Sequence, residues 1–590
     1  MPRGRGKGPR GGSSRGGRVS KSRRGGKISK ALTTKLRSDD NTPKETQNLD
    51  IGIEDVRGLF INSTSFEQHF QSQQKNPPGY QAAMLVLIKH KLELSSGSKA
   101  RALAAAIARH DHDLSKVMLK MPEVFGMVEV TKALSMLDAS RQLKISEKRL
   151  EKLDAMKTEL GYKVKDSKFS KLKNKIGNLQ ALKVNGSLSG AVAKQIKKWT
   201  CTIPKSELEF YALHFPKDPW KQVADLCHLN PKKDFQLEWF LGFCFGGEAP
   251  EDSLVHQCSK ITKENLNEVI QSIDIPYAYL KKLKDWFDNE TKIIIARKQD
   301  LTTIIWWYED LVCPEVTKII EDKLNAGQKV SFSYGKLMER IFTLNKSSSN
   351  KQIVEKLIDQ AENQLREISL TLKSPIAVLG DKSSSMQVCV TTSNIIASLL
   401  TMICDAHINF FDSQVVEAPF YPSSVESVLK LSETIRAGRT TAPAASLWPF
   451  YEKKQPINTF IVVTDEEENT SYKDFRFTEL YKKYTEEIHK AELVFVSFLR
   501  GQHDEGQMVK DLKKKEAVKG EDLKQFKFDA ARPDLTKLDH MFAVLSTSGD
   551  WYEVEVRETK ARIEADGLLS AAFNKINLAE EDKKDGWECI

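Results

Sequence analysis

The chain has 590 residues and a net charge of +10, a length that exceeds one hydrophobic core and predicts two or more domains. Its eight cysteines are scattered without a Cys-x-x-Cys pair, so we expect reduced thiols and neither a disulfide framework nor a zinc site. No run approaches the roughly 18 apolar residues of a membrane span, and the N-terminus lacks the apolar stretch of a secretory signal. We therefore expect a protein of the cytoplasm, with the nucleus as an alternative location, that has no membrane partner.

The first segment, residues 1–48, is a basic tail. Residues 1–50 hold 14 Lys and Arg against 4 Asp and Glu, which accounts for the whole net charge. The tail is Gly-rich and nearly free of apolar residues, so we predict that it is disordered. Arginine binds phosphate and stacks on bases, and glycine keeps the backbone flexible, so this composition favours RNA binding. A nuclear-targeting tail and a solubilising tail remain alternatives. The Arg-Gly repeats contain Arg3, Arg5, Arg10, Arg15, Arg18 and Arg24.

Residues 50–370 show helical patterns throughout. Apolar residues at helical spacing predict helices over 80–88, 99–107, 301–311, 315–324 and 335–341. Prolines such as Pro122, Pro204 and Pro314 separate these helices. Many short helices without a long heptad repeat indicate stacked helix pairs, as in an α-solenoid whose repeats are degenerate.

A basic block interrupts this helical region. Residues 141–200 hold 16 Lys and Arg against 5 Asp and Glu. Such a patch is typical of a surface that binds nucleic-acid phosphates, and the alternative is an ordinary solvated helix face. The candidate RNA-binding lysines are Lys171, Lys173, Lys175, Lys194, Lys197 and Lys198.

From residue 372 to 560, apolar strands alternate with helices, which predicts a mostly parallel, doubly wound α/β sheet. Strands are predicted at 375–380, 408–412, 459–464, 492–498, 541–545 and 551–556, and helices at 388–404, 424–435, 475–491 and 534–540. The last strand alternates as an edge strand with one wet face does. Residues 501–530 are predicted to be a charged loop or helix inserted late in the sheet. Residues 561–590 are predicted to be a helical, acidic tail, to which we assign no role.

Two of the predicted strands end in an acid. Asp381 ends the first and opens an Asp-x-Ser-x-Ser turn with Ser383 and Ser385, and Asp465 follows the strand 459–464. Thr440 lies on a Gly-containing loop between them. Ligands of open α/β sheets bind at the carboxyl ends of the strands, and Mg²⁺ takes about six oxygen ligands. These residues therefore predict a site for Mg²⁺ or another divalent cation. Alternatively, the acid and the serines cap the following helix.

The set Asp381, Ser383, Ser385, Thr440 and Asp465 matches the metal-ion-dependent adhesion site of von Willebrand factor A domains. A helical-repeat body followed by such an A-type domain resembles the Ro autoantigen family, whose helical part is the TROVE module. Further segments support the resemblance, with Arg439 standing where that family usually has glycine beside the threonine. These segments are Asn409-Phe-Phe-Asp412, Ile435-Arg-Ala-Gly438-Arg-Thr440, Phe460-Ile-Val-Val-Thr464-Asp465 and Trp220-Lys-Gln-Val-Ala-Asp-Leu-Cys-His228-Leu-Asn-Pro231.

The resemblance implies a HEAT-like helical ring, the TROVE module of residues 50–370, bridged by the A-type domain of residues 372–560. It also implies an RNA-binding ribonucleoprotein component that acts in small-RNA stability or quality control. Small structured noncoding RNA would bind the outer basic surface, and the single-stranded 3′ ends of misfolded RNA would enter the ring. His228 matches a helix-end position near the RNA-contacting surface, and an ordinary helix-capping histidine is the alternative.

Two other function classes remain. In the first, the protein is a scaffold whose metal binds acidic partners, RNA-processing proteins among them, through the A-type domain. In the second it is an enzyme, but no P-loop, Gly-x-Ser-x-Gly or His-Glu-x-x-His motif is present. Glu466 and Glu467 are the only candidates for a general base, and we expect them instead to extend the negative rim of the metal site. We therefore expect a protein that binds and does not catalyse.

Overall fold

The computed structural model describes residues 52–573, except 62–63, 91, 93, 159–164, 182–189, 216, 348–349, 369, 501–504, 520–521 and 548–549. The predicted tail 1–48, with its six candidate arginines, lies outside the described residues. So does the end of the chain from residue 574.

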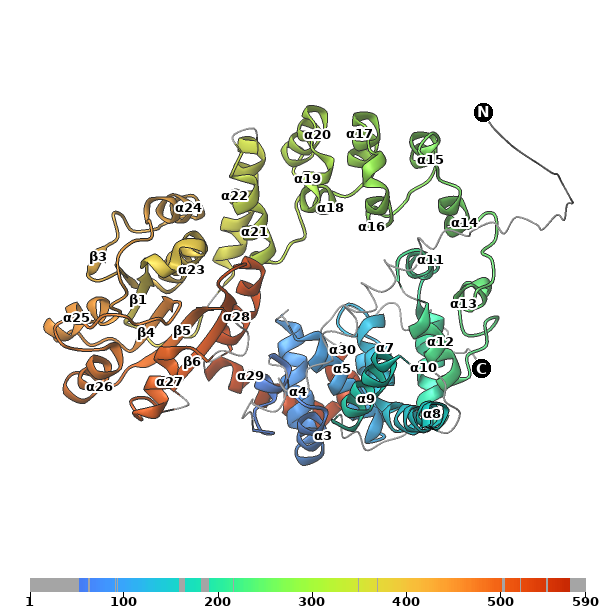
Figure 1. Ribbon diagram of the computed structural model, residues 1–590, viewed down its shortest axis with the longest axis horizontal. Coiled ribbons are helices and arrows are strands. Elements are labelled where there is room, and N and C mark those ends of the chain that lie inside the picture. The colour runs from blue at the N-terminus through green and yellow to red at the C-terminus, as the bar shows by residue number, and fades with distance from the viewer. Residues whose placement is uncertain are drawn as a thin grey trace, which may run out of the picture.

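Short helices form the first part of the chain and follow one another round a ring (Figure 1). Local caps define several of them: Ser65 and Gln68 close a capping box, and the carboxylates of Asp288 and Asp300 accept from the first turns of their helices. The helices are α2 (Val56–Ile61), α3 (Phe66–Lys75), α4 (Pro77–Lys89), α5 (Ser96–Ala108), α6 (His112–Leu119), α7 (Met127–Leu137), α8 (Ala139–Thr158), α9 (Asp166–Ala181), α10 (Gly190–Thr202), α11 (Lys205–His214), α12 (Asp218–Cys227), α13 (Glu238–Cys244), α14 (Leu254–Ser259), α15 (Leu266–Ser272), α16 (Tyr277–Leu280), η1 (Lys281–Trp286), α17 (Asn289–Lys298), α18 (Leu301–Trp306), α19 (Tyr308–Leu311), α20 (Pro314–Asn325), α21 (Tyr334–Leu344) and α22 (Lys351–Arg366). Four of the five predicted helical segments are confirmed, and the fifth, 301–311, forms two short helices, α18 and α19, that a turn at Trp307 separates.

An α/β domain follows, built on a six-stranded sheet of order β3-β2-β1-β4-β5-β6. All neighbouring strands are parallel except the β2–β3 pair at one edge. The strands are β1 (Ile376–Asp381), β2 (His407–Phe411), β3 (Val415–Glu417), β4 (Thr459–Thr464), β5 (Glu492–Leu499) and β6 (Leu523–Asp529), and the helices are η3 (Ser384–Val388), α23 (Val390–Cys404), α24 (Val425–Thr434), α25 (Ala444–Glu452), α26 (Phe477–Glu487), α27 (Gln507–Lys514), η5 (Leu535–Lys537), α28 (Leu538–Ser546), α29 (Asp550–Asp566) and α30 (Leu568–Phe573). The predicted fold class, a helical ring followed by a doubly wound α/β domain, is confirmed.

Two predicted strands are wrong. Residues 541–545 lie in α28 and residues 551–556 lie in α29. In α28 the buried Leu538, Met541, Phe542 and Leu545 have the i, i+3, i+4, i+7 spacing of a helix face. The alternating residues of 551–556 suggested an edge strand, but α29 runs on to Asp566, past residue 560 where we had placed the end of the domain.

The segment 501–530 also differs from the prediction. It contains the helix α27 and then β6, which forms the parallel edge of the sheet beside β5. Only Phe526 and Phe528 of β6 are buried. Because an edge strand has neighbours on one side only, four of the remaining five positions are polar, and the apolar signal is weak.

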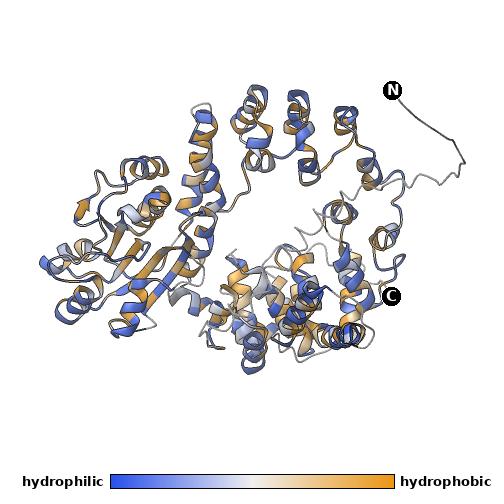
Figure 2. Cartoon of the chain, in the orientation of Figure 1, coloured by the Kyte–Doolittle hydropathy of each residue, from blue (hydrophilic) through white to orange (hydrophobic). Residues whose placement is uncertain are grey.

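The last helices close the ring. Tyr552 and Ile563 of α29 and Leu568 of α30 belong to the same apolar cluster as the N-terminal helices α2 to α7. Glu555 of α29 pairs with Lys89 at the end of α4, and Figure 2 colours the chain by hydropathy, with hydrophobic segments among these helices. Residues 561–573 of the predicted tail are therefore packed against the ring, and the rest of that tail lies outside the described residues. No helix in the described part of the chain is both long and apolar enough to span a membrane.

Candidate metal site and basic surface

The predicted metal ligands lie at the carboxyl ends of two neighbouring strands. Asp381 is the last residue of β1, and Asp465 directly follows β4, which pairs with β1 through Gly380 and Val463. Both strands are fully buried, so their backbones fix where the two acids leave the sheet. The structure therefore places the two carboxylates at one edge of the sheet, as the sequence predicts.

The Asp381 carboxylate is completely buried and held from two sides. Its Oδ1 accepts from the backbone N–H of Ser383 at 2.8 Å, and its Oδ2 accepts from the Thr464 hydroxyl at 2.6 Å. The Oγ atoms of Ser383 and Ser385 lie 3.1 Å apart on the turn that follows. One acid and two hydroxyls thus converge at the start of η3, and Ser383 occupies its N-cap position without a side-chain capping hydrogen bond, so the helix-capping alternative is not supported for Ser383.

The loop that carries Thr440 is attached to this turn. Gly438 donates its N–H to the Lys382 carbonyl at 2.8 Å, and the Arg439 carbonyl accepts from Ser384 N–H at 3.0 Å. Arg439 takes a left-handed conformation with φ of 62°, which explains why glycine suits this position in the resembling family. Arginine adopts the same backbone here, and Thr440 is exposed beside the turn. Its role as a ligand stays a prediction.

The electrostatics suit a cation. Burial, followed by the charge of Asp465, raises the pKa of Asp381 to about 7, and burial also raises the pKa of Asp465. Within the described residues no group of three or more His, Cys, Asp or Glu is arranged to hold a metal. The candidate site instead offers two carboxylates and the hydroxyls of Ser383 and Ser385, to which the predicted Thr440 ligand would add a third, and these hard oxygen donors fit Mg²⁺.

These pKa shifts predict how stability depends on pH. A raised aspartate pKa gives stability that is present below its ordinary value of about 3.9 and lost as the pH rises through about 7. A bound cation reverses this loss because it favours the ionised pair. We expect Mg²⁺ to raise the melting temperature of the full chain, measured against EDTA, clearly at pH 8 and hardly at pH 5.5. An equal increase at both pH values would contradict the assignment of Asp381.

Glu466 has a role that the sequence did not indicate. It does not extend a negative rim: its side chain is fully buried, and its φ of 63° turns it into the sheet. Its carboxylate accepts from Ser497 Oγ, from Gln525 Nε2 at 2.6 Å and from Val509 N–H at 3.0 Å. Gly506 makes room for this carboxylate, since a Cβ at that position would clash with it.

This buried carboxylate braces the metal site through the turn after β4. The Glu466 N–H donates to Thr464 Oγ1 at 3.0 Å, and the same hydroxyl donates to Asp381. Pattern reasoning missed this role because it depends on a positive φ, and no local residue pattern marks one.

We expect Glu466→Gln to weaken Mg²⁺ binding by about 10- to 100-fold, the usual effect of removing an outer-shell partner. The glutamine NH2 would replace one of the two accepting oxygens and meet a donor there, so at least one of the three hydrogen bonds would be lost and the turn that carries Asp465 would shift. Calorimetric titration of the full chain measures the affinity, and Glu486→Gln on the exposed face of α26 is the matched control. Equal Mg²⁺ affinities for the two variants would show that the hydrogen bonds of the Glu466 carboxylate do not support the metal site.

The basic block forms two separate parts of the helical ring. Lys171, Lys173 and Lys175 lie on α9, which packs against α8 and whose described side chains are all at least partly exposed. The three lysines are exposed, and Lys175 Nζ is 3.3 Å from Gln142 Oε1 on α8. Exposed Lys144, Lys148, Arg149 and Lys152 on α8 add to the charge of this hairpin.

The second part is α10, which Val192, Ile196 and Trp199 anchor in the core. Lys194 is exposed, whereas Lys197 and Lys198 are partly buried, and Lys197 Nζ lies 4.0 Å from Asp234 Oδ2. Because an acid partly neutralises Lys197, we expect the α8–α9 hairpin to contribute more to phosphate binding than α10.

His228 ends α12. It takes the left-handed conformation, with φ of 51°, and its backbone N–H donates to the Ala224 carbonyl. Its side chain is exposed. The helix-capping position is confirmed, and a contact with RNA stays a prediction.

Comparison with known proteins gives one kind of match. No protein-family model and no curated protein matches the sequence. Among solved structures, the crystal structure of the Ro protein (RSR) of Deinococcus radiodurans is similar, with 14% sequence identity and a TM-score of 0.43 over 75% of this chain and 92% of that chain. Such a similarity is too low to bear on what this chain binds. The neighbour carries the name of the family that the sequence motifs resemble, the Ro proteins.

Proposed function

We propose that the protein is a Ro-like, RNA-binding ribonucleoprotein component that binds small structured noncoding RNA. The observation that carries the proposal is the α8–α9 hairpin, whose exposed lysines and arginines project from the helical ring and outnumber its acidic residues. Lysine and arginine contacts to phosphates supply most of the affinity of such surfaces and make it strongly salt-dependent. The Arg-Gly tail 1–48 adds a second basic segment.

A role in small-RNA stability or quality control follows from the same reading. Single-stranded 3′ ends of misfolded RNA would enter the ring. A duplex is too wide to enter, so the shape of the RNA would decide what binds there. The protein would bind RNA and not process it, in the cytoplasm and, if the tail directs it there, in the nucleus.

The A-type domain supports a second, compatible role. Asp381 and Asp465 would hold the cation, and an acidic side chain of a partner would complete the coordination sphere. The proposed partners in this contact are RNA-processing proteins. In the alternative reading, this scaffold role is the only function and the basic surface is merely solvated.

A gel-shift titration of the full chain with total small RNA at rising salt tests the proposal. We expect binding whose logarithm falls linearly with the logarithm of the salt concentration, and sequencing of the co-purified RNA would identify the partner. Absence of RNA binding at low salt, together with Mg²⁺-dependent binding of an acidic peptide, would favour the scaffold.

Deleting residues 1–48 should lower RNA affinity generally and leave the preference among RNAs largely intact. The tail holds eight arginines in a Gly-rich sequence, a composition suited to phosphate contacts, and phosphate contacts carry no sequence information. Binding of a cognate and a bulk RNA to both forms measures the effect. If the truncated protein kept its affinity and lost discrimination, the tail and not the ring would select the RNA.

A further inference from the structure

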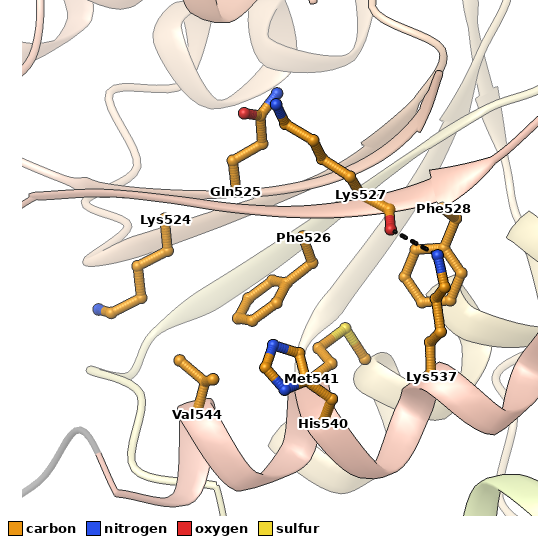
Figure 3. Close-up of a pocket in the computed structure, with 9 residues that line it drawn as sticks. All are labelled: Lys524, Gln525, Phe526, Lys527, Phe528, Lys537, His540, Met541 and Val544. Carbon is orange, nitrogen blue, oxygen red and sulfur yellow. Dashed lines mark hydrogen bonds between the residues drawn. The ribbon is translucent and has the colours of Figure 1, made fainter. Parts of the chain in front are cut away.

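A cavity of about 380 Å³ lies between the edge strand β6 and helix α28 (Figure 3). Its volume falls within the usual range of small-molecule sites. Because side chains alternate along a strand, Lys524, Phe526 and Phe528 face the helix, whereas Gln525 and Lys527 point to the other side of the sheet. Helix α28 and the adjoining turn contribute Lys537, His540, Met541 and Val544.

The lining has an apolar floor, an imidazole and two ammonium groups. Phe526, Phe528 and Met541 are buried and form the floor, and the His540 ring lies across from Phe526 in Figure 3. Burial, followed by the charge of Lys537, lowers the pKa of His540, so the ring is neutral near pH 7 and offers one donor and one acceptor.

The charge beside the cavity is positive. None of the lining residues is acidic. Lys524 Nζ lies 3.6 Å from the carboxylate of Glu492, which is not part of the lining. Lys373 shares that carboxylate, so a net positive charge remains beside the cavity.

We propose that this cavity binds one nucleotide of single-stranded RNA. Its base would lie between the rings of Phe526 and His540, and its phosphates would lie against Lys524 and Lys537. Single-strand sites combine this kind of positive groove with ring surfaces that accept any base. A peptide added as a further strand fits less well, because Lys537 Nζ already contacts the Lys527 carbonyl at the edge of β6, at 3.4 Å. The inference rests on the proposed RNA-binding function and gives the A-type domain its own contact with RNA.

The location makes this contact useful. Helix α28 packs against α21 and α2, where the α/β domain meets the two ends of the helical ring. Single-stranded RNA bound in the cavity would therefore lie beside the ring and not on the α8–α9 hairpin. The two surfaces would hold different parts of one RNA: the hairpin a structured part and the cavity an unpaired end.

The test uses the full chain and a fluorescent ten-nucleotide oligouridylate, with a small hairpin RNA and poly-glutamate as further probes. Lys524→Ala removes a phosphate contact and the cavity-filling Val544→Trp excludes the stacked base, so each should lower oligouridylate affinity about tenfold and leave hairpin-RNA affinity unchanged. Lys527→Ala is the matched control, because it removes a lysine of the same strand that points away from the cavity. A 4-thiouridine in the oligonucleotide should crosslink to residues 523–529 or 537–544 in the wild type and not in Val544→Trp.

The outcomes separate the inference from the proposed function. Wild-type oligouridylate affinity in both cavity variants, each shown to be folded by its melting curve, would overturn the cavity assignment while RNA binding by the hairpin persisted. Should Val544→Trp fail to fold, Lys524→Ala and the crosslink decide alone. Poly-glutamate that competes with oligouridylate at the crosslinked site and binds more tightly would assign the cavity to an acidic peptide. No binding of either RNA to the wild type would overturn both proposals.

Discussion

Asp381→Asn should abolish Mg²⁺ binding to the full chain and leave it folded. Two unit charges about 4 Å apart interact with about 4 kcal/mol near a protein surface, and about 1.4 kcal/mol is a tenfold change in affinity. Replacing one of the two carboxylates by an amide should therefore weaken Mg²⁺ binding by more than about 100-fold. Asparagine can still accept from Ser383 N–H and can donate to the Thr464 hydroxyl, so the buried hydrogen bonds survive. The larger change, Asp381→Ala, should have the same effect on binding but should lower stability, because it removes the acceptor of both buried hydrogen bonds.

The experiment requires the whole chain because α29 and α30 pack into the apolar cluster of the N-terminal helices. A fragment beginning at residue 372 would expose that surface. Glu417→Gln on the exposed edge strand β3 is the control for loss of one negative charge from the same domain. In EDTA at pH 8 the Asp381→Asn variant should also melt at a higher temperature than the wild type, since it no longer buries a charge. Unchanged Mg²⁺ affinity in a folded variant would rule out the metal assignment.

The sequence was sufficient where local pattern and burial agree. Strands β1 and β4 are unbroken apolar runs that end in an acid, so the strands and the position of Asp381 and Asp465 could be predicted together. The helices of the ring show the same agreement, for example in α5, where buried alanines and Leu103 mark one continuous apolar segment.

The sequence was insufficient to predict an element where contacts with residues distant in the chain determine its structure. The alternation of Trp551 to Val556 is compatible with a strand, and only docking against α4 makes this segment a helix. Strand β6 has few apolar residues because its outer side has no neighbour, so only its place beside β5 defines it. Glu466 shows a third cause: its carboxylate meets groups from β5, β6 and α27, and no sequence spacing predicts such a meeting.

Reversing the charges of Lys171, Lys173 and Lys175 to glutamate should weaken structured-RNA binding and flatten its salt dependence. Each phosphate contact contributes about one unit to the slope of log affinity against log salt. The helix geometry divides the three residues: at about 100° per residue, Lys171 and Lys175 lie on one face of α9, whereas Lys173 lies on the other side of the helix. Lys175 also leans towards α8, whose basic residues extend the same surface. One RNA backbone can contact Lys171 and Lys175 on their shared face more readily than it can contact all three lysines on two faces.

We therefore expect Lys171→Glu with Lys175→Glu to lower the slope by about two units and to reproduce most of the effect of the triple variant. Lys173→Glu alone should lower it by about one unit at most. Lys346, Lys351 and Lys356 are exposed lysines on and beside α21 and α22, and their reversal controls for the equal change in net charge. Fluorescence titrations with one hairpin RNA over a series of salt concentrations give both affinity and slope. If the control triple weakened binding as much as the α9 triple, the effect would come from overall charge, and α9 would be an ordinary solvated helix. If the α9 variants alone lost affinity but kept the wild-type slope, the lysines would support the fold of the hairpin and not contact phosphates, because a lost phosphate contact must reduce the number of released counterions.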